Sequence, residues 1–163
     1  MASWADVERE APAFAKTVRE RFDAHTNKLL ATLRADGAPR ISAIEADFHD
    51  GELWLGMMAG SRKAADLHRD PRLALHAASE DPADAGTDWA DAKLSGRGVE
   101  ITDDDERRRL HAAFGTPEQH SDGHLFRVDI EEVVLTRLGG DPPDRLVIHL
   151  WRPGAPLRRM ERR

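Results

Sequence analysis

The chain has 163 residues, 40% of them hydrophobic and 33% charged, and a formal net charge of -6. This length suits a single domain over residues 1–163, and no apolar run is long enough to span a bilayer. The acidic balance argues against a duplex-binding protein, because such proteins rely on a basic face. The absence of cysteine excludes disulfides and thiolate chemistry, and without a visible secretory signal we expect a cytoplasmic protein.

The first predicted element is an amphipathic helix over about residues 4–24. Ser3 and Asp6 have the spacing of a capping box, in which each side chain accepts a hydrogen bond from the other residue's backbone N–H. The apolar residues that follow at helical spacing are Val7, Ala11, Phe14, Val18 and Phe22. They share one face, which we expect to turn toward the core.

Short apolar runs separated by turns fill residues 28–151 and predict a β-rich region. Asp36-Gly37 and Asp50-Gly51 separate the first three runs, and Asp-Gly between apolar runs is a strong hairpin signal. The first three strands should therefore form an antiparallel meander.

Three places in this region predict irregular strands. In the second apolar run, the alternation of apolar and polar residues shifts by one position near Ala43. A later run is interrupted by Gly96 and Gly98. In the longest run, the apolar residues before Glu131-Glu132 and those after it fall on alternate positions that do not match. Bulges reconcile such patterns, with a sharp bend as the alternative near Ala43 and the close approach of another group as the alternative at Gly96 and Gly98. Bends and bulges of this kind are frequent in barrels. Six to seven antiparallel strands with repeated bulges predict a mainly β fold, a closed or split β-barrel with peripheral helices.

The C-terminal residues are predicted to form a short tail. Pro153 to Pro156 should end regular structure, because proline and glycine favour turns. The residues beyond include Arg158, Arg159, Arg162 and Arg163. We interpret this cluster as a solvated tail, with a tail that binds nucleic acid or a partner as the alternative.

The most informative segment is a strand that runs through a glycine turn into a helix. The apolar run Leu53 to Met58 leads through Gly60 to Ser61, Arg62 and Lys63, and helix-forming residues follow. A helix N-terminus presents unpaired N–H groups and a positive dipole end, so these side chains predict a phosphate site. The alternative for the same residues is a plain helix cap followed by solvated cations.

Neighbouring residues could complete a site for a larger ligand. Met57 and Met58 are adaptable side chains that suit a flat ring, although plain core packing is the alternative for both. Arg40 and Ser42 on the adjacent predicted strand could reach the same end of the barrel, or they could line an exposed hairpin face.

Four segments in order carry a resemblance to a known family: Leu30 to Ser42, Asp50 to Leu55, Ser61 to Leu67 and Asp70 to Leu75. Together they resemble the pyridoxamine 5'-phosphate oxidase-like superfamily of flavin and deazaflavin oxidoreductases, which fold as an FMN-binding split barrel. The resemblance implies a homodimer that binds FMN, or the deazaflavin coenzyme F420, in clefts at the subunit interface. It further implies hydride transfer between this cofactor and a small organic substrate.

The resemblance also implies a set of cofactor-binding residues. The serine, arginine and lysine that open the helix grip the phosphate, the two methionines flank the ribityl side, and the strand after the first turn lies along the ring system. Trp89 and Trp151 would close the cleft from the partner subunit, with core packing as the alternative for both. The implied contacts are Arg40, Ile41, Ser42, Ala43, Met57, Met58, Ser61, Arg62, Lys63, Trp89 and Trp151.

The C-terminal segment departs from true pyridoxamine phosphate oxidases. Trp151-Arg152-Pro153-Gly154 stands where those enzymes carry an Arg-Leu-x-Pro segment that holds the substrate phosphate, so vitamin B6 oxidation is not expected. FMN is the first choice of cofactor and F420 the alternative. A stress-type protein that sequesters the cofactor without turnover is the rival to an enzyme.

No other catalytic or metal site is predicted. His120 and His124 flank a glycine-containing loop without a third clustered ligand, which favours a surface loop over a metal site. A hydrolase is not supported, because no Gly-x-Ser-x-Gly elbow is present. No side chain stands out as a general acid or base.

Overall fold

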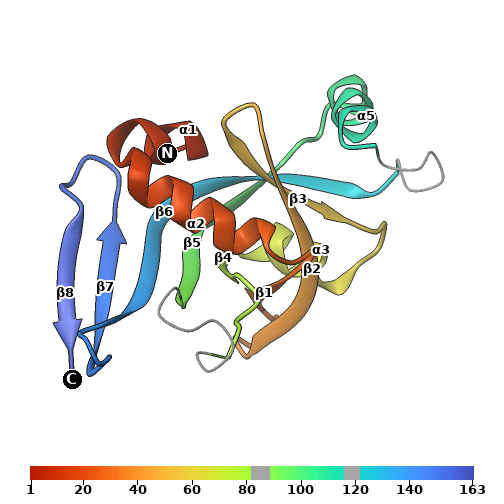
Figure 1. The fold of residues 1–163 in the computed structure, drawn as a ribbon. Helices are drawn as coiled ribbons and strands as arrows, with labels where there is room; N and C mark the ends of the chain where they lie inside the picture. Colours follow the sequence, from red (N-terminus) through yellow and green to blue (C-terminus); the bar gives the residue numbers. More distant parts are fainter. Residues whose placement is uncertain (82–88, 116–121) are drawn as a thin grey trace.

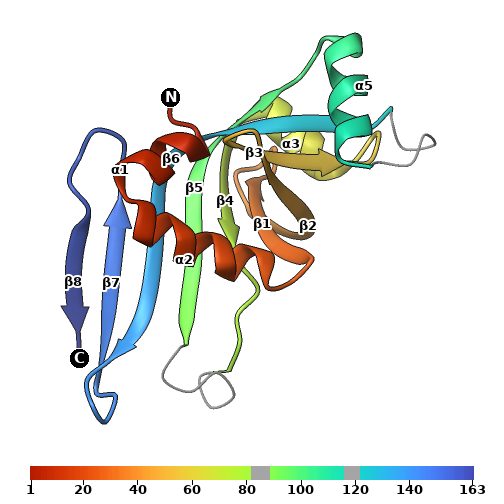
Figure 2. The same ribbon diagram turned by 45° about the horizontal axis from the view of Figure 1, so that its top comes forward.

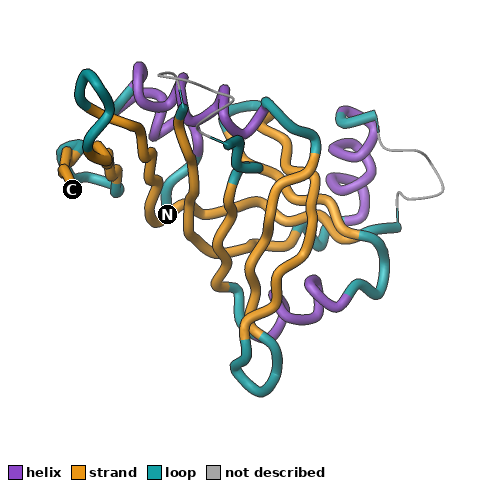
Figure 3. Tube along the Cα trace, turned by 60° about the horizontal axis from the view of Figure 1, so that its bottom comes forward, coloured by secondary structure: helices purple, strands orange, loops and turns teal. Residues whose placement is uncertain are grey.

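The computed structural model describes residues 1–81, 89–115 and 122–163. The described elements, in chain order, are α1 (Trp4–Glu10), α2 (Pro12–Asp23), β1 (Asn27–Leu33), β2 (Pro39–His49), β3 (Glu52–Met57), α3 (Arg62–Arg69), β4 (Arg72–His76), β5 (Ala90–Glu100), α5 (Asp104–Ala113), β6 (His124–Gly139), β7 (Arg145–Trp151) and β8 (Arg158–Arg162). The strands from β1 to β6 wrap around a common interior, β7 and β8 extend to one side of it, and the helices lie at the periphery (Figures 1 and 3). Of the described helices, none combines the length and apolar character that crossing a membrane requires.

All strand pairs are antiparallel, and they run in the order β3-β2-β1-β4-β5-β6-β7-β8. An additional pairing of β3 with β6 closes the first six strands of this order into a barrel. The mainly β, split-barrel prediction is confirmed. β6 pairs with three strands. Its first residues pair with β3 and its last ones with β7, while β5 pairs with it along most of its length.

The predicted single N-terminal helix is wrong, because the chain forms two helices that meet at Ala11 (Figure 2). Pro12 is the first residue of α2, and a proline has no N–H to continue the preceding helix. The capping box is confirmed: Ser3 Oγ accepts from the Asp6 N–H, and the Asp6 carboxylate accepts from the Ser3 N–H. The predicted apolar face is still buried across the break.

The bulge predicted near Ala43 is absent. β1 and β2 pair without interruption from Asn27↔Glu45 to Leu33↔Pro39. Ile41 instead points outward with an exposed fraction of 72%, whereas Ile44 faces the core. Inward and outward side chains alternate regularly along β2. The sequence pattern was misleading because the apolar Ile41 stands on the outer face.

The bulge predicted at Glu131-Glu132 is confirmed. Ser95 pairs with Glu132 but Gly96 pairs with Ile130, which leaves Glu131 as the extra residue. A Cβ at Gly96 would lie 2.2 Å from the backbone oxygen of Asp129, so only glycine allows the strands to approach this closely.

The predicted C-terminal tail is wrong, because residues 158–162 form β8 and pair with β7. Gly154 adopts a φ of 69° in the turn between the two strands, a conformation that suits glycine. The turn residues therefore reverse the chain instead of ending regular structure, and the backbone of β7 gains a hydrogen-bonded partner on its outer side.

Candidate functional site

The predicted strand–turn–helix segment has the expected form. β3 ends at Met57, Gly60 turns with a φ of 70°, and Ser61 is the N-cap of α3. Ser61 Oγ accepts a hydrogen bond of 3.3 Å from the N–H of Ala64. The N–H groups of Arg62 and Lys63, in the first helical turn, have no hydrogen-bond partner among the described residues, which makes this end attractive for an anion.

Two cationic side chains stand beside these donors. Lys63 Nζ donates to the backbone oxygen of Ala43 at 2.8 Å, which brings the start of α3 against β2. Burial lowers the pKa of Lys63, since the charged form is poorly solvated there. Arg62 is exposed and has no hydrogen bond or ion pair within the described residues. Among the described residues, no carboxylate pairs with Arg62 or Lys63, so both cations can bind an anionic group.

A buried carboxylate fixes α3 to the barrel. Asp66 Oδ2 accepts from Thr32 Oγ1 at 2.9 Å and from Arg40 Nε at 2.6 Å, while Oδ1 accepts from Arg69 at 2.8 Å. Burial alone would raise the pKa of Asp66, but the hydrogen bonds from Arg40, Thr32 and Arg69 outweigh it and lower the pKa to about 2. Arg40 thus joins β2 to α3 and does not line an exposed hairpin face.

A cavity of about 500 Å³ adjoins the start of α3, a size typical of small-molecule sites. Four of the predicted site residues meet in its wall, namely Ala43, Met57, Met58 and Lys63. The remaining lining residues are Asn27, Ile44, Glu45, Asp47, Trp54, Gly56, His111, Phe114, Gly115 and Leu125. Met57 is buried and Met58 is exposed, so the methionine pair marks the boundary between the core and the cavity mouth.

Other predicted residues lie elsewhere. Ile41 lines a second cavity of about 600 Å³ on the outer face of the sheet. Trp151 requires a correction: its indole is 1% exposed in the core and donates to Glu10 at 3.0 Å, so it contacts neither cavity. Trp89 donates to the backbone oxygen of Glu80 at 2.8 Å and is absent from both cavity walls.

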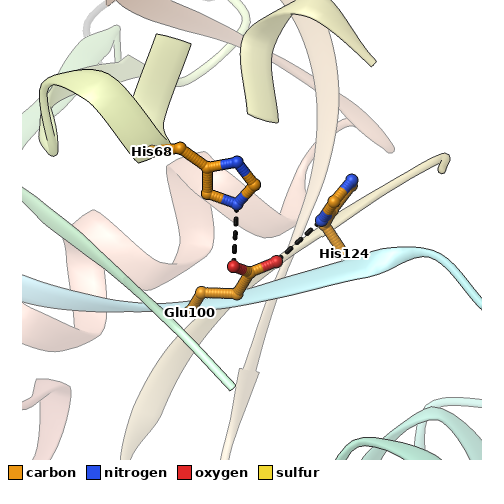
Figure 4. A group of neighbouring side chains, drawn as sticks. All are labelled: His68, Glu100 and His124. Carbon is orange, nitrogen blue, oxygen red and sulfur yellow. Dashed lines mark hydrogen bonds and ion pairs between the residues drawn. The ribbon is translucent and has the colours of Figure 1, made fainter. Parts of the chain in front are cut away.

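A second cluster, for which the sequence contains no local signal, consists of His68, Glu100 and His124 (Figure 4). His68 Nε2 and His124 Nδ1 each lie 2.7 Å from a different oxygen of Glu100. Glu100 is 32 residues from His68 and 24 from His124, so only the folded chain brings them together. His120, which the sequence suggested as a neighbour of His124, lies outside the described residues.

Comparison with solved structures shows the same fold in several proteins. An FMN-binding, pyridoxamine 5'-phosphate oxidase-related protein from Nostoc punctiforme aligns at a TM-score of 0.64 and 14% identity, covering 100% of this chain and 98% of its own. PhzG from Burkholderia lata aligns at 0.60 and 15%, covering 93% and 89%. A Clostridium acetobutylicum protein related to general stress protein 26 aligns at 0.57 and 15%, covering 91% and 94%.

Sequence comparison identifies the family. No curated protein matches the chain. The family model described as pyridoxamine 5'-phosphate oxidase matches residues 14–137, from within α2 to near the end of β6, and this range includes α3 and the residues that line its cavity. The chain therefore belongs to the pyridoxamine 5'-phosphate oxidase family.

Proposed function

We propose that the protein binds FMN with its phosphate at the N-terminus of α3 and transfers hydride between this flavin and a small organic substrate. One observation carries the proposal: Arg62 and Lys63 flank the open N–H groups of α3, without acidic partners among the described residues, beside a ligand-sized cavity. A phosphate dianion suits such a set of donors. The family membership and the FMN-binding neighbour from Nostoc punctiforme support this choice.

The cavity wall fits the rest of a flavin. Ile44, Trp54, Met57 and Leu125 offer apolar surface for a flat ring system. Glu45 and Asp47 lie two and four residues beyond Ala43, or about 7 and 13 Å along β2, so these carboxylates are displaced from the phosphate end. When bound, the isoalloxazine supplies the two-electron chemistry. The chain itself holds the phosphate, orients the ring and excludes water from one of its faces.

Pyridoxamine phosphate is not the substrate that we propose. Arg152 occupies the region where true oxidases hold the substrate phosphate, but it is paired with Glu132 at 2.6 Å. Trp151 beside it is part of the core. Trp151 is therefore not available to a second phosphate, and Arg152 would have to give up its pair with Glu132 to bind one.

Reconstitution is the direct test of the cofactor. The purified chain is titrated with FMN and, separately, with F420, while absorbance and fluorescence are recorded. We expect saturable binding of one FMN per chain, and F420 is the alternative ligand. No spectral change with either cofactor would contradict the proposal. Tight binding without reduction of any acceptor by the reduced cofactor would favour the non-catalytic, cofactor-sequestering alternative.

We further propose that the protein is a homodimer, joined through the outer face of β1 and β2. Leu29 and Ile41 are 48% and 72% exposed there. Leu29 pairs with Ala43 and Ala31 pairs with Ile41, so these side chains form a continuous apolar strip beside the second cavity. An exposed apolar strip of this kind is typical of protein–protein interfaces, and the resemblance to dimeric flavoproteins favours a second copy as its occupant.

Replacement of Ile41 by aspartate is expected to separate the dimer, because a carboxylate would be desolvated in the interface. Sedimentation equilibrium should give twice the 18.2 kDa chain mass for the wild type and the single-chain mass for the variant. Leu157→Asp serves as the control, since Leu157 is also exposed but lies outside the strip. A wild-type protein that sediments as a monomer at micromolar concentration would refute the proposed interface.

A further inference from the structure

We propose that His68, Glu100 and His124 bind a divalent transition metal ion of the Zn²⁺ type, which would fasten the end of α3 to the barrel (Figure 4). One possible ligand atom from each residue lies within 4.8 Å of the other two. The site is separate from the cavity beside Lys63, because none of its three residues lines that cavity. The proposal is therefore independent of flavin binding.

Three rigid elements position the cluster. Glu100 ends β5 and pairs with Phe126, and His124 stands two residues before Phe126 on the same face of β6. His68 comes from the last turn of α3. Gly98 on β5 leaves room beside this helix: a Cβ there would lie 3.3 Å from Leu67 Cδ1, a contact that only a small shift of the leucine would relieve. The three side chains therefore converge without any contribution from a loop.

The ligand set matches borderline transition metals. Two imidazoles and one carboxylate suit Zn²⁺ and similar ions, whereas Mg²⁺ and Ca²⁺ prefer oxygen ligands throughout. With metal–ligand bonds of about 2.0–2.2 Å, neighbouring ligand atoms of a tetrahedral site lie about 3.3 Å apart. The present nitrogen–oxygen distances of 2.7 Å would have to widen by about half an ångström, and any separation near the 4.8 Å bound of the cluster would have to close by about 1.5 Å.

The surroundings favour a cation and leave it an open coordination position. A carboxylate only accepts hydrogen bonds, so both ring nitrogens now donate to Glu100, and a metal ion would replace these two protons. His68 stands at the C-terminal, negative end of α3, where a cation is stabilised. Its side chain is about half exposed, so a fourth ligand can be water. The ring of Phe126 lies 5.7 Å from that of His68 and supports its orientation.

The test uses the full chain, freed of metal with a chelator and containing no flavin. Isothermal titration with Zn²⁺ should give one ion per chain, and Co²⁺ should give the visible absorption of a nitrogen-ligated site. His68→Ala and His124→Ala should each weaken Zn²⁺ binding by about 100-fold or more, beyond the 10–100-fold loss typical of an outer-shell partner. Zn²⁺ should raise the melting temperature of the wild type but not of these variants.

His25→Ala is the matched control, because His25 also lies beside a glutamate, 3.4 Å from Glu80, but outside the cluster. It should bind Zn²⁺ as the wild type does. Glu100→Gln keeps the shape of the side chain and tests the site if a histidine variant fails to fold; it too should lose at least tenfold in affinity. Wild-type protein that takes up no Zn²⁺, or His68→Ala and Glu100→Gln proteins that bind it unchanged, would overturn the proposal.

Discussion

Replacing Arg62 and Lys63 together with glutamate is expected to weaken FMN binding about a thousandfold, or about 4 kcal/mol. Each cation would contribute a charge-assisted hydrogen bond to the phosphate, and each glutamate would add repulsion. The two residues stand at the start of α3, where Arg62 has no partner within the described residues. Fluorescence titration of the folded variant with FMN measures the loss.

The control for this double reversal is Arg158→Glu with Arg162→Glu on β8, which changes the net charge equally but away from the cavity. It should leave the affinity within about threefold of the wild type, because exposed charges at a distance are largely screened. An unchanged affinity in the Arg62 and Lys63 variant would show that the phosphate binds elsewhere.

Asp66→Asn is expected to lower the free energy of unfolding by about 3 kcal/mol, since breaking a buried ion pair leaves an uncompensated charge. Asp66 is 3% exposed and is the acceptor for Arg40, Thr32 and Arg69. Urea unfolding gives the difference. Asp23→Asn is the matched control: its pair with Arg19 is equally short, at 2.6 Å, but exposed, so the loss should stay below about 1 kcal/mol. Equal losses in the two variants would contradict the anchoring role of Asp66.

The wild type and the Asp66→Asn protein should also differ in how much stability they lose in acid. The pKa of Asp66 is lowered to about 2 in the folded chain, from 3.8. A lowered folded-state pKa means that the stabilisation is complete above the unfolded-state value and is lost as the pH falls through the folded-state value. About 2 kcal/mol of wild-type stability should therefore disappear between pH 5 and pH 2, whereas Asp66→Asn should lose less. A difference in unfolding free energy between the two proteins that stays constant over this pH range would contradict the pKa assigned to Asp66.

Features that depend on neighbouring residues could be predicted from the sequence. The capping box at Ser3, the Asp-Gly hairpins, the helix start at Ser61 and the bulge at Glu131 each have a local signal, such as a side-chain cap, a glycine turn or a change in the alternation of apolar residues. The break at Pro12 also had a local signal, but the apolar spacing across it was regular and dominated the prediction. Local chemistry thus accounts for the element types and for one end of α3.

The rest depended on contacts between distant residues. The outward position of Ile41 follows from the register between β1 and β2, which its own strand does not determine. The bond from Thr32 to Asp66 spans 34 residues, and the pair of His68 with Glu100 spans 32. Periodicity carries no information about such pairs, so the role of Arg40 as an anchor and the histidine–glutamate cluster were both missed.

The pairing of β3 with β6 has a consequence for how copies of the chain can associate. Within the described strands, β8 ends the sheet and is paired along one side only. That edge carries Arg158, Arg159 and Arg162 with one glutamate, and a second copy aligned along it would bring like charges together. Growth of the sheet by strand addition at β8, a route to aggregation, is thereby discouraged.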